Sequence, residues 1–198
     1  MSLSIEDIKR LKDLTGVGLT DAKKALTEAE GDFDKALEAM RKKGMTKAEK
    51  RGEREARNGV VDSYVHDNRI GVIVEVNCET DFVARNEKFT ELVKDVAMHI
   101  AASAPEYLSS DDIPADVRDE KTAEFTEKAK NEGKPEAMLD KIVGGMVDKY
   151  FAERCLLSQP YIKNPDQTVG DLVKEANAQL GENILVRTFS RIQLGELS

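Results

Sequence analysis

The side chains best suited to nucleophilic chemistry are two cysteines and two histidines. Cys78, His66 and Asp81 can be considered as a nucleophile, a base and an orienting acid, because such a set is defined by geometry and not by chain order. A cysteine at the end of a predicted strand is more often a small buried hydrophobic residue, and we interpret Cys78 in this way. No Gly-x-Ser-x-Gly elbow occurs either. We therefore predict no catalytic residue and no enzyme.

Metal and nucleotide sites need patterns that this sequence lacks. Neither His66 nor His99 has a second metal-type ligand at a useful helical offset, and Cys78 and Cys155 are too few for a multi-cysteine zinc site. No GxxxxGK[ST] phosphate loop occurs, and the glycines of segment 16–18 form only a fragment of a dinucleotide fingerprint. We expect no metal, no cofactor and no nucleotide bound by the chain itself.

The segment CETDFVARNEKF, residues 78–89, has a pattern typical of a binding site. A predicted strand ends there and a helix begins, with Thr80 and Asp81 as capping residues directly before an aromatic side chain. Two interpretations stay open. Phe82 and Val83 fold back as a hydrophobic staple over the helix start, or Phe82 projects as a rigid anchor that loses little side-chain entropy on docking.

Three short helices are predicted in about the first 45 residues, a size that cannot bury all of its apolar groups. The turn over 14–20 is therefore expected to display Val17 and Leu19, and the alternative is that both complete a small core. The apolar stripes of the helices lie within 5–14, 22–29 and 33–40, and the predicted caps and stops are Ser4, Asp7, Thr20, Asp21, Gly31, Asp32 and Gly44.

The segment 45–57 is strongly charged and has almost no large apolar residue, so we interpret it as a solvated linker or an exposed helix. Beyond it, two runs rich in β-branched residues, 60–66 and 69–78, are separated by Asp67 and Asn68, which suit a hairpin turn. The sequence therefore predicts a domain boundary followed by two antiparallel strands.

The rest of the chain is predicted to be mainly helical. Two of the helices meet at residues 133–135, a connection short enough for an antiparallel helical hairpin. The first of them is mostly polar, with a thin stripe of Val117, Ala123 and Phe125, so we expect part of this arm to project into solvent or to meet another chain. The predicted helices are 86–101, 115–131, 136–157 and 168–180, and a third strand is predicted around Ile184, Val186 and Thr188.

These elements predict an α+β protein in two domains. A three-helix domain with its charged linker covers residues 1–54. An α+β core covers residues 55–198, with a small three-stranded antiparallel sheet and a helical arm at about 115–157.

Composition narrows the range of partners. The 198 residues carry a net charge of −8, which is poorly suited to a long phosphate backbone, so we expect no direct nucleic-acid partner. No stretch approaches the roughly 18 consecutive apolar residues of a membrane helix, and the N-terminus lacks the apolar core of a signal peptide. With only two cysteines, reduced thiols and a cytoplasmic location are expected, without membrane partners.

Several stretches resemble the bacterial elongation factor Ts family. They are TGVGLTDAKKAL with GDFDKALEAMRKKG, then SYVHDNRIGVIVEVNCETDFV, and QTVGDLVKEANAQ near the C-terminus. The likeness covers essentially the whole chain and is to the short form of the family. It implies that the three N-terminal helices form a ubiquitin-associated-like (UBA-like) domain.

The resemblance also implies a function, guanine-nucleotide exchange in translation elongation. Such a protein binds elongation factor Tu in its GDP form and disturbs the magnesium and phosphate-loop region, so that GDP leaves and GTP can rebind. The partner-binding residues that the resemblance implies are Thr80, Asp81, Phe82 and Val83 near the magnesium site, Leu11, Val17, Leu19 and Thr20 in the N-terminal domain, and His66 as a weaker candidate contact.

The resemblance further bears on oligomeric state. Longer members of the family carry two related core subdomains and an extra C-terminal helical module, whereas this chain has a single hairpin of the SYVH type. We therefore expect a symmetric homodimer, without a constitutive disulfide through Cys78 or Cys155. The alternative function is a UBA-like protein-recognition module without exchange activity, in which residues 1–44 bind alone and Phe82 is dispensable.

Overall fold

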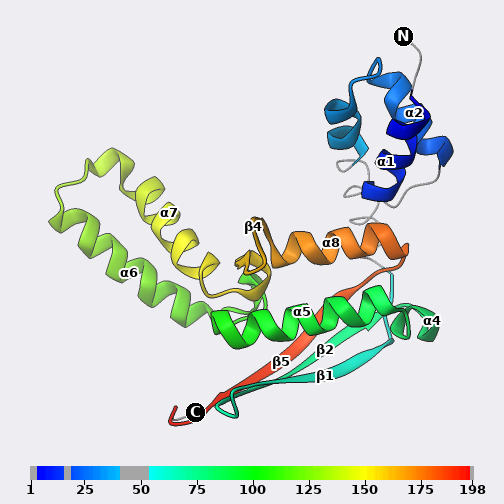
Figure 1. The fold of residues 1–198 in the computed structure, drawn as a ribbon. Helices are drawn as coiled ribbons and strands as arrows, with labels where there is room; N and C mark the ends of the chain where they lie inside the picture. The colour runs from blue at the N-terminus through cyan, green and yellow to red at the C-terminus, as the bar shows by residue number, and fades with distance from the viewer. Residues whose placement is uncertain (1–3, 16–18, 41–53, 197–198) are drawn as a thin grey trace. The chain divides into compact units, whose positions relative to one another are not determined.

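The computed structural model describes residues 4–15, 19–40 and 54–196 (Figure 1). The chain folds into two compact units, each built from several segments. The first unit is Met1–Val61, Glu75–Val93 and Leu172–Arg187, and the second is Asp62–Val74, Lys94–Asp171 and Thr188–Ser198. The predicted domain boundary near residue 54 stays a prediction.

The N-terminal part of the first unit contains α1 (Ile5–Thr15), α2 (Leu19–Glu28) and a further helical stretch at 33–40. Ser4 Oγ accepts a hydrogen bond from the Glu6 backbone N–H at 3.1 Å, and Asp32 Oδ1 accepts one from the Lys35 N–H at 3.0 Å, so both predicted caps are confirmed. The predicted stop at Gly44 lies outside the described residues. The buried cluster of these helices is Leu11, Ala22, Ala25, Leu26, Ala36 and Met40.

A three-stranded sheet has the order β1 (Asn58–His66), β2 (Ile70–Cys78), β5 (Leu185–Gln193). Asp67 and Asn68 both have positive φ, 49° and 54°, as a two-residue hairpin turn requires, and this confirms the predicted hairpin. The Leu194 N–H, just after β5, donates to the Arg69 carbonyl, just before β2, so these strands also run antiparallel. The sheet and the surrounding helices confirm the predicted α+β class.

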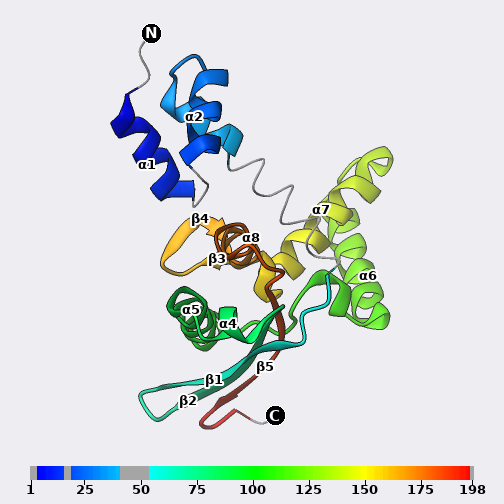
Figure 2. The same cartoon turned by 90° about the vertical axis from the view of Figure 1, so that its right-hand side faces the viewer.

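Strand β2 alternates strictly between buried and more exposed residues. Val72, Val74, Val76 and Cys78 are buried, whereas Ile73 between them is exposed, so successive side chains lie on opposite faces of the sheet. Helix α5 (Glu87–Ser103) lies beside the sheet in both views (Figures 1 and 2), and it buries Phe89, Val93, Val96 and Ile100 along one stripe.

The second unit contains the helical arm, α6 (Ala115–Asn131) and α7 (Leu139–Ala152), which pack against each other (Figure 2). They join through Gly133, whose φ of +69° suits glycine, and a 3₁₀ turn at Glu136–Met138, so the predicted hairpin is confirmed. Val117 and Phe125 of the predicted thin stripe pack on the arm's core, whereas Ala123 is exposed. The buried residues of this core are Ile113, Ala129, Leu139, Val143, Val147, Phe151 and Cys155.

The predicted end of the second arm helix, residue 157, is wrong. Helix α7 ends at Ala152, because a strand-like segment at 106–108 provides other hydrogen-bond partners for the backbone that follows. The Arg154 carbonyl accepts from the Glu106 N–H at 2.9 Å, and the Leu156 N–H donates to the Tyr107 carbonyl at 2.8 Å. A 3₁₀ turn at Leu156–Ser158 follows, and another, Ser110–Asp112, precedes α6.

A two-stranded hairpin, β3 (Pro160–Tyr161) and β4 (Asn164–Thr168), was not predicted, because its strands are too short to show a periodic pattern. Asp95 of α5 holds it, since its carboxylate accepts hydrogen bonds from the Tyr161 hydroxyl and the Lys163 ammonium, both at 2.7 Å. Helix α8 (Val169–Leu180) then follows, within one residue of the predicted 168–180; Thr168 Oγ1 caps its start, and Gly181, with φ +78°, follows its end. None of the described helices is long and apolar enough to cross a membrane.

Candidate functional site

The corner after β2 is a single helical turn, α4 (Asp81–Ala84), which Arg85 and Asn86 connect to α5. Thr80 has the extended conformation of an N-cap, φ −128° and ψ 155°, and its Oγ1 accepts a hydrogen bond from the Val83 N–H at 3.4 Å. Asn86 caps the next helix in turn, because its Oδ1 accepts from the Lys88 N–H at 2.9 Å. The predicted capping role of Thr80 is confirmed.

Phe82 projects from this corner into solvent, with 82% of its surface exposed. Ala84 on the same turn is buried and Val83 is half-buried, so the turn packs inward through these residues while Phe82 lies outside. Asp81 is also exposed, and its Oδ2 lies 3.4 Å from Nη2 of Arg85 one turn later. Of the two interpretations of Phe82, the exposed anchor agrees with the structure and the folded-back staple does not.

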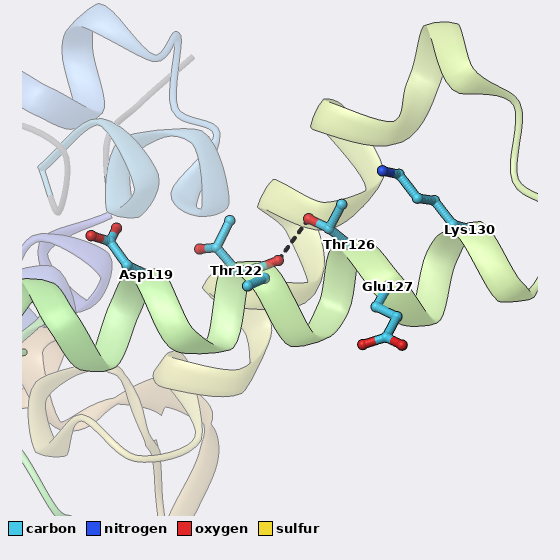
Figure 3. A pocket seen from close by; sticks show the side chains of 6 residues that line it. Asp119, Thr122, Thr126, Glu127 and Lys130 are labelled. Atoms are coloured by element: carbon cyan, nitrogen blue, oxygen red, sulfur yellow. Dashed lines mark hydrogen bonds between the residues drawn. The ribbon is translucent and has the colours of Figure 1, made fainter.

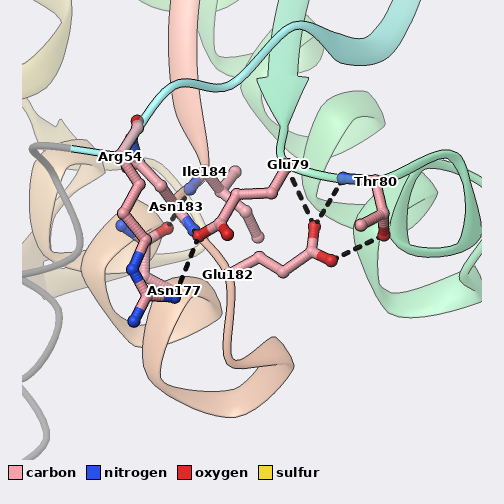
Figure 4. Close-up of polar contacts among 7 residues, drawn as sticks. All are labelled: Arg54, Glu79, Thr80, Asn177, Glu182, Asn183 and Ile184. Atoms are coloured by element: carbon pink, nitrogen blue, oxygen red, sulfur yellow. Dashed lines mark hydrogen bonds and ion pairs between the residues drawn. The ribbon is translucent and has the colours of Figure 1, made fainter.

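A residue from the far end of the sequence contacts the corner directly (Figure 4). Glu182 Oε2 accepts hydrogen bonds from the backbone N–H groups of Glu79 at 3.0 Å and Thr80 at 3.1 Å. Glu182 Oε1 accepts a third from the Thr80 hydroxyl at 2.6 Å. Glu182 was not identified from the sequence, where its position two residues after the predicted helix 168–180 was the only available signal.

The loop after α8 also donates hydrogen bonds to the corner and to Arg54. Glu79 Oε1 accepts a hydrogen bond from the Asn183 N–H at 2.7 Å, and the Arg54 guanidinium lies 3.5 Å from the same oxygen. The buried Asn183 amide donates to the Arg54 carbonyl at 2.6 Å. Two adjacent residues of the corner, 79 and 80, are therefore joined to two adjacent residues of the loop after α8.

The residues expected to dock the N-terminal domain on a partner differ in how exposed they are. Leu19 and Thr20 are exposed at the start of α2, and Val17 lies outside the described residues. Leu11 is 0% exposed and belongs to the core of the N-terminal helices. We therefore correct its assignment from docking surface to core, because a side chain without exposed surface cannot contact a partner unless the helices move apart.

His66 and Cys78 lie in different environments, the first exposed and the second buried. His66 is exposed at the end of β1, with Nδ1 3.1 Å from the Tyr64 hydroxyl and Nε2 3.6 Å from Asp67. Cys78 is buried, and burial, with a smaller effect of the Glu182 charge, raises the pKa of its thiol. A reactive cysteine needs the opposite shift, so Cys78 is not an activated nucleophile. Burial likewise raises the pKa of the Cys155 thiol.

A shallow hollow of about 460 Å³ lies along one face of α6 (Figure 3). Its lining residues are Asp119, Thr122, Ala123, Thr126, Glu127 and Lys130. Thr126 Oγ1 is already engaged, since it donates to the Thr122 carbonyl at 2.7 Å. Across the parts of the chain that the structure describes, no group of three or more His, Cys, Asp or Glu side chains is placed to hold a metal ion.

Comparison with known proteins identifies the family. The family model described as Elongation factor TS matches residues 8–196. Elongation factor Ts of Alkaliphilus oremlandii is 51% identical over 99% of this chain and 91% of its own length. That of Moorella thermoacetica is 49% identical over 98% of this chain and 96% of its own length, and that of Thermodesulfovibrio yellowstonii is 46% identical over 99% of this chain and 98% of its own length. This chain belongs to the elongation factor Ts family.

Proposed function

We propose that this chain acts in translation elongation as a guanine-nucleotide exchange factor for elongation factor Tu. It binds the GTPase in its GDP form, and Phe82 disturbs the magnesium and phosphate-loop region so that GDP leaves and GTP can bind. Membership of the elongation factor Ts family supports the partner, and the exposed Phe82 supports the mechanism. The chain makes and breaks no covalent bond in this role.

The observation that carries the proposal is the exposure of Phe82 on a capped turn. Burying a phenylalanine side chain stabilises a protein by about 1.5–3 kcal/mol, and this fold forgoes that gain at residue 82. The turn is capped by Thr80, and α5 begins three residues after it ends, so the backbone of Phe82 is restrained from both sides before docking. A pre-ordered aromatic side chain loses little entropy on binding, which is typical of an interface anchor.

Weakened phosphate binding is sufficient to release GDP. In GTPases the magnesium ion and the backbone of the phosphate loop neutralise the phosphate charges of the nucleotide, so a side chain that displaces either one removes much of the binding free energy. Coupling between two ligands is reciprocal. If this protein weakens GDP binding by some factor, GDP weakens binding of this protein by the same factor, and the ternary complex is transient.

The N-terminal helices provide the second contact in this proposal. Leu19 and Thr20 begin α2, where their exposed side chains are available to a partner. We assign them to docking, which sets affinity, and Phe82 to the release step, which sets the rate. Asp81 and Val83 flank Phe82 and complete the contact at the magnesium site, and His66 stays a candidate contact.

We also propose that the protein forms a homodimer through the outer face of its sheet. In the second unit the sheet strands carry large exposed apolar side chains, Val65, Ile73 and Ile192, and Leu194 directly after β5 is exposed as well. Exposed apolar side chains on a sheet are typical of interaction sites, and a second copy would present the same side chains to them. Cys78 and Cys155 are free and buried, so neither is placed to link two copies by a disulfide.

Release of a fluorescent GDP analogue from elongation factor Tu tests the function. We expect catalytic amounts of the wild-type protein to accelerate release many-fold. Phe82→Ala should lower the maximal rate at least tenfold with little change in the half-saturating concentration, because it removes the group that acts in the release step. Leu19→Ala should raise the half-saturating concentration and leave the maximal rate nearly unchanged.

Met138→Ala is the matched control, since Met138 is another large exposed apolar side chain but lies at the tip of the helical arm. It should behave like the wild type in both quantities. Unchanged GDP release with the wild-type protein would overturn the proposal. Full activity of Phe82→Ala would overturn the assigned role of Phe82 and favour a recognition module without a wedge.

A further inference from the structure

We propose that Glu182 is a positioning residue for Phe82. From the loop that follows α8, its carboxylate holds the backbone of the corner from which Phe82 projects. The inference rests on the proposed function, because it assigns Glu182 a part in the same release step. It differs in kind from a partner contact, since Glu182 acts through the corner and not on elongation factor Tu.

The carboxylate is bound at the place where the corner begins. Three hydrogen bonds of 2.6–3.1 Å join Glu182 to the consecutive residues Glu79 and Thr80, which end two positions before Phe82 (Figure 4). Hydrogen bonds to an ionised acceptor are stronger than neutral ones. Because two of the donors are backbone N–H groups, the contact restrains the main chain itself and therefore the direction in which the next residues leave β2.

The Thr80 hydroxyl transmits this restraint to the turn. It donates its proton to Glu182 Oε1, so its lone pairs are free to accept the hydrogen bond from the Val83 N–H. The cap bond is long, 3.4 Å, and α4 has only four residues. A single helical turn is not stable by itself in water, so the orientation of α4 depends on groups outside it.

The loop that carries Glu182 is itself held firmly. Asn183 beside it is 2% exposed, and its backbone N–H and side-chain amide donate to Glu79 Oε1 at 2.7 Å and to the Arg54 carbonyl at 2.6 Å. Asn177 Oδ1 of α8 accepts from the Ile184 N–H at 2.9 Å. Glu182 therefore extends from a loop that is itself hydrogen-bonded. Residues 79 and 80 donate to Glu182, and Asn183 donates to Glu79.

Loss of the Glu182 carboxylate should lower the maximal rate of GDP release without weakening docking. Without Glu182, Phe82 would sample several directions, and each docking event would first have to order the turn. The maximal rate of GDP release would fall, because misplacement of a group that acts in the key step reduces the rate. Docking through the N-terminal helices would be unchanged, so the half-saturating concentration would stay close to that of the wild type.

The experiment compares Glu182→Ala, Glu182→Gln and the control Glu175→Ala in the GDP-release assay, with each variant first shown to be folded by circular dichroism. Glu175 is an exposed glutamate of α8 whose carboxylate accepts a hydrogen bond from Gln179, one turn later on the same helix, at 3.4 Å. We expect Glu182→Ala to lower the maximal rate about tenfold. Glu182→Gln should stay within about threefold of the wild type, because the amide has the same shape and its oxygen accepts both backbone N–H bonds.

Two further measurements separate positioning from a general loss of stability. Hydrogen exchange of the Glu79, Thr80 and Val83 amides in the protein alone should be at least tenfold faster in Glu182→Ala and unchanged in Glu175→Ala. In a Phe82→Ala background, Glu182→Ala should cause almost no additional loss of rate, because a residue that acts through Phe82 has nothing left to position.

The outcomes are distinguishable. If the wild-type protein does not accelerate GDP release, the proposed function fails and the role of Glu182 in release fails with it. If the wild type is active and Glu182→Ala matches it in rate, or lowers the rate equally with and without Phe82, the inference about Glu182 alone is overturned.

Discussion

His99 Nε2 lies 2.9 Å from Oε1 of Gln159, and both side chains are buried. The Ile162 backbone N–H donates to His99 Nδ1 at 3.3 Å, so the ring proton belongs on Nε2, from which it is donated to Gln159. The Gln159 amide in turn donates to the Glu153 carbonyl at 2.8 Å. A neutral imidazole therefore joins α5 to the segment that leads into β3.

This contact predicts a loss of stability in acid. Burial lowers the pKa of His99 below its ordinary value of 6.5. Well above pH 6.5 the ring is neutral in the folded and the unfolded chain, so it adds no pH dependence there. Below that, the unfolded chain takes up a proton that the folded protein resists, and the free energy of unfolding falls by up to about 1.4 kcal/mol per pH unit.

Urea unfolding at pH 7.5, 6.5 and 5.5 measures this effect. His99→Gln should show a shallower pH dependence of the free energy of unfolding than the wild type between pH 6.5 and 5.5. Equal slopes for wild type and His99→Gln would show that His99 does not titrate in this way.

Replacing Gly59 in β1 by alanine adds one methyl group and should destabilise the protein strongly. Its φ is +152°, and a Cβ atom there would overlap the Val76 carbonyl oxygen and lie 2.8 Å from the Asn77 Cα. Since these neighbours are backbone atoms of the adjacent strand, they cannot turn aside. We expect Gly59→Ala to lower the free energy of unfolding by more than about 2 kcal/mol, measured by denaturant titration.

Gly71 in β2 is the matched control for this substitution. A Cβ there meets no atom within 4 Å, and its φ is not in the left-handed region. Gly71→Ala should therefore change the stability by less than about 0.5 kcal/mol. Similar effects of the two substitutions would contradict the steric account of Gly59.

If the protein forms a homodimer through the outer face of its sheet, the dimer should depend on Ile73, which is exposed there. A charge in the centre of an apolar interface is costly to bury, whereas an exposed position accepts one without loss of folding. Ile73→Asp should therefore shift a dimer to monomer, measured by sedimentation equilibrium over a range of concentrations. Met138→Asp, at the arm tip, should leave the dimer intact. A wild-type protein that is monomeric throughout would refute the homodimer.

Features governed by neighbouring residues could be predicted from the sequence. The turn at Asp67 and Asn68 was predictable because these two residue types adopt positive φ more readily than most. The bounds of α6 were also predictable, since Pro114 and Gly133 lie just outside them. The end of α7 was not, because the residues after Ala152 bond to a segment some 50 positions earlier in the chain.

At the candidate site too, some features follow from neighbouring residues and others only from the tertiary structure. By itself, the sequence determined that a capped corner carries Thr80 and Phe82, since cap, turn and aromatic residue are adjacent. Only the tertiary structure decided that Phe82 is exposed, that Leu11 is buried and that Glu182 binds Thr80 from 102 positions away. Burial and long-range hydrogen bonds depend on which distant segments the folded chain brings together, and no local pattern of residue types records that choice.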